Sequence, residues 1–256
     1  MTFPNFRNKH AHDSIFTPEE FLKYQRNLGK YPKFKPPKGV IFCYSARLLE
    51  HILRNHKTIK VEGFYGEFYL LRETKNQIGV LAKFGVGAPV VVTLMEELTT
   101  FGVKKFISMG EAGTLQKTLK IRDIVVCNRA IRDEGTSQHY LKHSKYAYAS
   151  ERMTREIEKA LQKCGQKYIV GTSWTIDAPY RETTAEARQY QKEDVATVDM
   201  EASALFAVAK YRAVDIGAIF TISDSLAELK WNPKFHLSET NWEILFQIAK
   251  EALLNS

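Results

Sequence analysis

The sequence predicts an α/β fold, built as a single domain around a mixed or largely parallel β-sheet. Short apolar runs typical of buried strands alternate along the chain with stretches of helical spacing, as at residues 40–44 and 46–55. Glycine and acidic residues follow several of these runs directly, at the strand ends where ligands bind in such sheets. The chain has 256 residues, of which 44% are hydrophobic, and is long enough to bury a sizeable core.

Residues 1–38 are predicted to form an N-terminal arm that precedes the α/β domain of residues 39–256. Within the arm, Thr17 is a good helix N-cap, a proline follows at the first helical position, and Glu20 completes a capping box. The Lys- and Pro-rich run at 30–38 is typical of a linker.

Hydrophobic periodicity and turn residues place the remaining elements in order. Strands are predicted at 40–44, 64–71, 79–84, 105–109, 123–127, 168–172, 197–199 and 216–223. Helices are predicted at 46–55, 90–101, 150–164, from 201 through 210, and at 239–253. The run at 74–77 suits a hairpin turn between two of the strands.

Composition excludes several classes of protein. The net charge is +8, but the basic residues are spread along the chain, which favours attraction to anionic small molecules over nucleic-acid binding. The three cysteines form no CxxC pair, so we expect no disulfide framework and no metal site, in a reducing cytoplasm. No apolar run approaches the ~18 residues of a membrane span, and the first residues lack the apolar core of a signal peptide.

A glycine-rich segment, Gly-Val-Gly-Ala-Pro at 85–89, follows a predicted strand and opens a helix. Its backbone N–H groups can approach an anion or a sugar, or it is only a tight strand-to-helix turn, and the segment alone does not separate these interpretations. It is not a dinucleotide fingerprint, because Pro89 and Val90 stand where the last glycine belongs.

Three acids follow predicted strands and have a structural and a functional interpretation each. Glu111 lies in a glycine turn at 110–113 and faces either solvent or a ligand. Asp224 is either the N-cap of the next segment or a general acid whose pKa is raised in a partly apolar pocket. Glu201 either matches the helix N-terminus electrostatically or accepts hydrogen bonds from a substrate's hydroxyls.

Four segments together resemble the nucleoside phosphorylase family, whose members split the N-glycosidic bond of purine nucleosides or uridine. They occur in the family's order over roughly residues 38–254. The segments are 85–89; 110–115; 131–137 with His139 and Tyr140; and 198–201 with Ser223 and Asp224.

This resemblance implies a three-layer α/β/α sandwich around a central mixed sheet, assembled as dimers, trimers of dimers or related rings. It implies no cofactor, with phosphate as co-substrate. It assigns catalysis to Glu201, which accepts hydrogen bonds from the ribose hydroxyls, and to Asp224, which assists the departing base at N7 and favours purines. Substrate binding is assigned to Met200, Asp199, Ser223, Gly87, Gly110, Glu111, Ala112, Trp174, Tyr180 and Arg181. For Trp174 and Tyr180 the alternative to stacking on a base is core packing.

The sequence departs from the family where phosphate binds. The family's Gly-Asp-Pro turn is Tyr-Ser-Ala beginning at Tyr44, its phosphate-binding Arg is Ser108, and its Thr or Ser in the second glycine segment is Ala112. Substitutes for the lost contacts are Arg47, Lys60 or Arg181. The first hypothesis is therefore a purine nucleoside phosphorylase. The alternatives are a nucleosidase that uses water, with Glu111 as a replacement base, and a catalytically silent nucleoside-binding paralogue.

The N-terminal arm carries two more candidates. Family members borrow an N-terminal His from a neighbouring subunit to bind the ribose 5′ end, and His10 and His12 could serve so. The alternative is a solvated arm.

Overall fold

A computed structural model describes residues 4, 6 and 9–256 of the chain. Its strands are β1 (Gly39–Cys43), β2 (Thr58–Val61), β3 (Glu67–Leu71), β4 (Ile78–Ala82), β5 (Lys105–Thr114), β6 (Ile124–Asp133), β7 (Tyr146–Tyr148), β8 (Ile169–Ile176), β9 (Val195–Asp199), β10 (Asp215–Ser225) and β11 (Asn232–Pro233). Its α-helices are α1 (Pro18–Asn27), α2 (Ala46–Asn55), α3 (Ala88–Phe101), α4 (Glu151–Lys163), α5 (Thr184–Lys192), α6 (Ala202–Arg212), α7 (Phe235–Ser238) and α8 (Trp242–Asn255).

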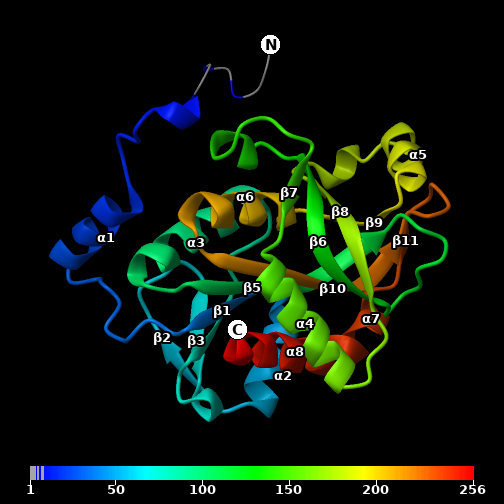
Figure 1. The fold of residues 1–256 in the computed structure, drawn as a ribbon. Helices are drawn as coiled ribbons and strands as arrows, with labels where there is room; N and C mark the ends of the chain where they lie inside the picture. Colours follow the sequence, from blue (N-terminus) through cyan, green and yellow to red (C-terminus); the bar gives the residue numbers. More distant parts are fainter. Residues whose placement is uncertain (1–3, 5, 7–8) are drawn as a thin grey trace.

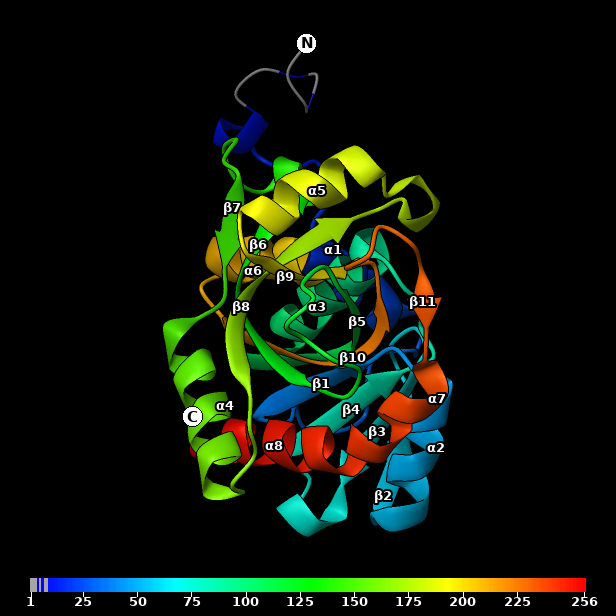
Figure 2. The same ribbon diagram turned by 90° about the vertical axis from the view of Figure 1, so that its right-hand side faces the viewer.

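The strands form one mixed sheet that partly closes on itself. Its order is β11-β10-β6-β8-β9-β5-β1-β4-β3-β2, with β7 beside β6. Strand β10 pairs in parallel with β5 and antiparallel with β6, so that β5, β10, β6, β8 and β9 form a closed ring of paired strands. The open part of the sheet extends from this ring and consists, in order, of β1, β4, β3 and β2 (Figure 2).

Helices cover both faces of the sheet, with α3 and α6 on one side and α2, α4 and α8 on the other (Figure 1). Alternation along β1 explains the two cores, because successive side chains in a strand point to opposite faces. Phe42 stacks on Phe106 toward the first pair of helices, at 5.6 Å between ring centroids. Ile41 packs in the second core with Ile107 and Phe246. The predicted α/β fold with layers around a central mixed sheet is confirmed.

Most predicted elements are present, and the helix at 46–55 has the expected bounds. The hairpin at 74–77 is confirmed, since β3 and β4 pair antiparallel. Strands and α-helices that the sequence analysis did not predict are β2, β7, β11, α5 and α7. For α5 the signal was present: Thr183 and Glu186 form a complete capping box at its start.

The prediction of a glycine turn at 110–113 is wrong. These residues continue β5. Along one edge β5 pairs first with β1 and then with β9, and along the other edge it pairs with β10 over its whole length. Neither Gly110 nor Gly113 has the positive φ that a glycine turn requires. Neighbouring side chains pack so closely on this part of β5 that a Cβ at Gly110 or Gly113 would contact them.

The N-terminal helix has the predicted capping box, in which the Thr17 side chain accepts the Glu20 N–H and the Glu20 carboxylate accepts the Thr17 N–H. Helix α1 lies against α3 (Figure 1). The division of the chain into an arm and a domain at residue 38 stays a prediction. Among the described residues, no helix is both long enough and apolar enough to cross a membrane.

Candidate functional site

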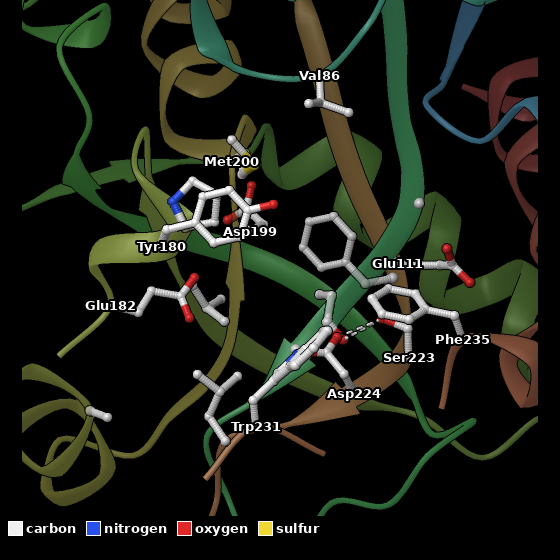
Figure 3. Close-up of a pocket in the computed structure, with 18 of the residues that line it drawn as sticks. Val86, Glu111, Tyr180, Glu182, Asp199, Met200, Ser223, Asp224, Trp231 and Phe235 are labelled. Carbon is white, nitrogen blue, oxygen red and sulfur yellow. Dashed lines mark hydrogen bonds between the residues drawn. The ribbon is translucent and has the colours of Figure 1, made fainter. Parts of the chain in front are cut away.

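A pocket of about 780 Å³ opens where β5, β9 and β10 meet. The segment of β5 at 110–113 forms its floor. On one side of β5, Gly113 pairs with Asp224 of β10, and on the other side it pairs with Val198 of β9. Glu201, which follows β9, and Asp224, near the end of β10, therefore line one space from opposite edges of β5. Figure 3 shows Asp199 of β9 and Asp224 of β10 in this pocket.

The glycines of the floor make room for this arrangement. A Cβ on Gly113 would lie 3.0 Å from Oδ2 of Asp224 and 2.9 Å from the side chain of Leu226. A Cβ on Gly110 would lie 3.3 Å from the ring of Tyr44. Larger residues at these two positions would thus displace the side chains that line the pocket.

Glu201 lies at the N-cap position of α6 and is buried, with 8% of its surface exposed. Its Oε1 accepts the backbone N–H of Gly87 at 2.5 Å, so the glycine loop before α3 binds this carboxylate. Burial, and secondarily the negative charge of Asp199, raises the pKa of Glu201 to about 8. The ionised form of Glu201 therefore attracts a nearby positive charge more strongly than the protonated form does.

The neighbouring acid, Asp199, is saturated by the protein itself. Its Oδ1 accepts the hydroxyls of Ser173 and Thr175, and its Oδ2 accepts the backbone N–H groups of Glu201 and Ala202. Although Asp199 is at the pocket wall, its four hydrogen bonds hold the first turn of α6, and so position Glu201.

Asp224 lines the opposite edge of the pocket, with 8% of its surface exposed. Ser223 Oγ donates to Oδ1 at 2.8 Å, and the indole N–H of Trp231 donates to Oδ2 at 3.0 Å (Figure 3). Burial raises the pKa of Asp224, and these two hydrogen bonds act in the opposite direction. A carboxyl with a raised pKa in a pocket is suited to donate a proton.

Two further acids line the same pocket. Burial raises the pKa of Glu182 to about 7, and within the described part of the chain no side-chain hydrogen bond or ion pair reaches its carboxyl. Burial also raises the pKa of Glu111, whose carboxyl accepts the Ser238 hydroxyl at the start of the C-terminal helices. The pocket is therefore rich in carboxyl groups.

At the other end of the pocket, the two positions that depart most from the family pattern contact each other. The Tyr44 hydroxyl and Ser108 Oγ are 3.0 Å apart, and the Tyr44 ring packs over Gly110. Burial, and then the charge of Glu201, raises the pKa of the Tyr44 hydroxyl, so it stays neutral. Tyr44 and Ser108 thus stand where the family pattern has the glycine of its Gly-Asp-Pro turn and its phosphate-binding arginine.

Cationic side chains are scarce around this space. Among the described residues, Lys230 is the cationic side chain that lines the pocket. Of the three substitutes predicted for phosphate binding, Arg47 pairs with Glu239, Lys60 pairs with Glu67, and Arg181 is exposed beside the pocket mouth.

Most of the predicted site residues are brought together, although their roles stay predictions. The pocket is lined by Glu201, Asp224, Met200, Asp199, Ser223, Gly110, Glu111, Ala112 and Tyr180. Tyr180 is at the rim and almost fully exposed. Neither Arg181 nor, in the described part of the arm, His10 and His12 lines the pocket. Gly87 is also outside the lining and acts through Glu201.

The assignment of Trp174 to the substrate is wrong. Its side chain is 0% exposed, packs at 4.9 Å from the Tyr190 ring, and donates its indole N–H to Asp133. The inward face of β8 points it into a core beneath α5, as the core-packing alternative had it.

Sequence reasoning missed the segment between β10 and α7. Its side chains close one side of the pocket: Leu226, Leu229, Lys230, Trp231 and Phe235. A signal was available, because Leu226, Leu229, Trp231 and Phe235 give this short segment after Asp224 several large apolar side chains, which is unusual for a surface loop. The described residues contain no cluster of three or more His, Cys, Asp or Glu side chains that could hold a metal ion.

Comparison with known sequences gives one family for most of the chain. The model of the phosphorylase superfamily matches residues 40–252. Over 142 residues the chain is 30% identical to a guanosine phosphorylase of Halorubrum lacusprofundi, and this match covers 56% of the chain and 59% of that relative. The chain thus spans about three fifths of the length of this relative.

Two solved structures share the fold over most of the chain. An AMP nucleosidase from Bacteroides thetaiotaomicron has a TM-score of 0.76 at 21% identity, covering 93% of this chain and 97% of that one. A uridine phosphorylase from Vibrio fischeri has a TM-score of 0.72 at 24% identity, covering 86% and 91%. At these identities the likeness shows a common fold.

Proposed function

The chain belongs to the phosphorylase superfamily, and from this premise we propose that it cleaves the N-glycosidic bond of a nucleoside. The observation that carries the proposal is the placement of Glu201 and Asp224 on opposite edges of one pocket. One carboxylate can stabilise an electron-poor sugar while the other acid assists the leaving base. As the bond breaks, the sugar gains positive charge and the base gains negative charge, and these two changes are the largest in the reaction.

In the proposed reaction, the bond between C1′ and the base nitrogen lengthens and its electron pair moves to the base. The Glu201 carboxylate accepts hydrogen bonds from the ribose hydroxyls beneath the developing oxocarbenium ion, with Met200 against the sugar. Asp224 gives its proton to N7 of the base, which leaves neutral, and an oxygen nucleophile bonds to C1′. A purine is favoured, because uracil has no N7 to receive the proton.

For the nucleophile we propose inorganic phosphate, in keeping with the relative named a phosphorylase. The products are then the free base and ribose 1-phosphate, and no cofactor takes part. A cytoplasmic location and a homo-oligomer, as a dimer, a trimer of dimers or a related ring, belong to the same proposal. The exposed aromatic rim at Tyr180 and Trp231 is a surface that such an assembly could cover.

A second candidate is hydrolysis, favoured by the chemistry of the pocket. Phosphate is an anion, while this pocket is lined by five carboxyl groups and, among the described residues, by Lys230 as its cationic side chain. Water needs no cationic clamp. Glu111, whose pKa is raised by burial, is the candidate base.

One assay tests the proposal and separates the two acceptors. Inosine, adenosine and uridine are incubated with the protein in phosphate buffer and in a phosphate-free buffer, and the free base, ribose and ribose 1-phosphate are quantified. Phosphorolysis requires phosphate-dependent release of base with one ribose 1-phosphate for each base. Release of free ribose at the same rate in both buffers assigns the hydrolase, and absence of any free base contradicts both candidates.

A further inference from the structure

We propose that Trp231 is a positioning residue for the base-side acid, acting through its hydrogen bond to Asp224. This inference rests on the proposed function, since it assigns Trp231 a part in the same reaction. The indole N–H lies 3.0 Å from Oδ2 of Asp224, while Ser223 Oγ lies 2.8 Å from Oδ1. Each oxygen of the carboxyl therefore has its own hydrogen bond, and the plane of the group is fixed.

A turn after β10 folds the chain back, so that the indole lies beside Asp224. After β10, the backbone N–H of Leu226 bonds to Thr114 of β5, and a turn follows in which Leu229 has a φ of +57°. The return strand β11 then pairs antiparallel with β10, with Pro233 opposite Asp224. The Lys234 N–H closes this pairing on the carbonyl of Ser223. Trp231 thus lies directly before a strand that is registered against the acid.

The chemistry of indole makes this contact directional. The indole nitrogen donates and cannot accept, so Oδ2 must present a lone pair to it in both protonation states of Asp224. The carboxyl proton is therefore held on the remaining positions of the group, which include Oδ1 beside Ser223. A donor that occupies one lone-pair position of Oδ2 limits where the proton can reside, and so favours proton transfer in a narrower range of directions.

Exposure separates this tryptophan from the other two. Trp231 is 61% exposed, whereas Trp174 is 0% and Trp242 is 5% exposed. Core packing does not explain a large indole left so open, and its ring lies 6.5 Å from that of Phe235 at the rim of the pocket (Figure 3). The hydrogen bond to Asp224 is its principal polar contact with the protein.

Several ionisable groups share the pocket with Asp224 and have to be separated from it in any pH experiment. Glu111 faces it from β5, Glu182 from the segment before α5, and Lys230 from its own loop. Asp199, Glu201, Tyr44 and Tyr180 line the same space. The variant Asp224→Asn removes the relevant titration and leaves the others in place.

The first experiment compares Trp231→Phe with the parent protein in nucleoside cleavage over a range of pH. Phenylalanine keeps an aromatic ring but removes the donor. We expect kcat to fall about tenfold, as for the loss of one hydrogen bond to a charged group, with KM changed less than threefold. The alkaline limb of kcat/KM moves to higher pH, because the N–H no longer stabilises the ionised carboxyl. An unchanged limb together with kcat within twofold of the parent overturns the proposal.

A double-mutant cycle tests whether Trp231 acts through Asp224. In the Asp224→Asn background, the further change Trp231→Phe should alter kcat less than twofold, because the group it orients has lost its proton-donating role. A tenfold loss in both backgrounds means that Trp231 acts independently of the acid, for example through the fold, and contradicts the proposal.

A fluorescence measurement needs no activity and so distinguishes failure of this inference from failure of the proposed function. The difference in emission between the parent and Trp231→Phe gives the fluorescence of Trp231. Because Trp231 is exposed and the other two tryptophans are buried, its emission is distinguishable from theirs. We expect that emission to change with pH in the nucleoside-free parent and to lose this change in Asp224→Asn. A pH response that is the same in both proteins overturns the inference. If no nucleoside is cleaved but the response depends on Asp224, the contact stands and the proposed reaction is wrong.

Discussion

The two ends of the pocket are built on different principles. At one end, Glu201 and Asp224 lie beside opposite edges of β5. Both are buried, their orientation is fixed by hydrogen bonds, and burial raises the pKa of each. At the other end, Tyr44 and Ser108 are neutral, bonded to each other, and packed over a glycine. The first end holds charge-bearing groups toward the cavity, and the second satisfies its polar groups internally.

This difference teaches where the chemistry of the site is constrained. Burying an acid destabilises its ionised form, so Glu201 and Asp224 lower the free energy of unfolding at any pH where they are ionised. The Tyr44–Ser108 end carries no such cost. Under the proposed function, the side of the pocket with Glu201 and Asp224 is the specialised one, and the Tyr44–Ser108 side is the part that can differ between phosphate and water as acceptor.

The largest test of the contrast is Asp224→Asn. The amide keeps the size and most hydrogen bonds of the carboxyl but cannot give a proton to the base, so kcat on inosine should fall about 10²–10⁴-fold, the usual contribution of a general acid. Steady-state kinetics measures the loss. A riboside whose leaving group needs no protonation, such as 4-nitrophenyl riboside, serves as the control. Unchanged turnover of inosine would falsify the role of Asp224.

Glu201→Gln tests the other charged group, with an expected loss in kcat/KM of about 10²–10³-fold from weaker stabilisation of the electron-poor sugar. In the parent, kcat/KM should rise with pH up to about 8, because the free enzyme must lose the proton of Glu201. This limb is absent in the variant. A parent profile that is flat between pH 6 and 8 would show that the ionised form of Glu201 is not needed.

The same substitution should have the opposite effect on stability. The pKa of Glu201 is about 8 in the folded protein against an ordinary 4.5, so the folded state binds the extra proton between these values. The stability that this proton contributes is present below pH 4.5 and is lost as the pH rises through 8. Glu201→Gln should therefore raise the unfolding midpoint at pH 9, relative to the parent, and change it little at pH 5. Denaturation by urea at both pH values measures this difference.

The sequence located most of this charged end because its signals are local. Val-Asp-Met-Glu before a helix and Ser-Asp at the end of an apolar strand name the positions of Glu201 and Asp224 directly. The strands that carry them were likewise predictable from apolar runs. What could not be predicted is that β9 and β10 flank the same two residues of β5, Gly113 and Thr114. Ring closure through β6 and β8 depends on pairings that are distant in sequence.

Other errors have the same physical origin. The glycines at 110 and 113 were interpreted as a turn, whereas they lie in a strand to admit Tyr44 and Asp224, which only the folded chain brings near. Tryptophan is a residue type that often stacks on a base. The side chains of β8 alternate between the two faces of the sheet, however, and that of Trp174 points into the core. The contact between Tyr44 and Ser108 joins two departures from the family that appear unrelated along the chain.

A gain-of-function change at the neutral end sharpens the comparison. In the double variant Tyr44→Gly, Ser108→Arg, the arginine fills the space of the tyrosine with a cation. We expect phosphate to bind about tenfold more tightly and to raise the thermal unfolding midpoint more than it does in the parent, because a ligand stabilises the state it binds. Tyr44→Gly, Ser108→Ala is the control without the charge. Equal phosphate shifts in both variants would mean that this end is not where the anion binds.

The smallest expected effect concerns Glu182, whose carboxyl lines the pocket and has no hydrogen bond from the described side chains. Its pKa of about 7 lets it accept a hydrogen bond from a 6-amino purine when ionised, or donate one to a 6-oxo purine when protonated. The ratio of kcat/KM for adenosine to that for inosine should therefore rise about fivefold between pH 6 and 8. In Glu182→Gln this ratio should not depend on pH, since an amide offers both a donor and an acceptor at every pH. If the parent ratio is constant while the individual rates vary, Glu182 does not contact the base, and discrimination between purines lies elsewhere on the charged side of the pocket.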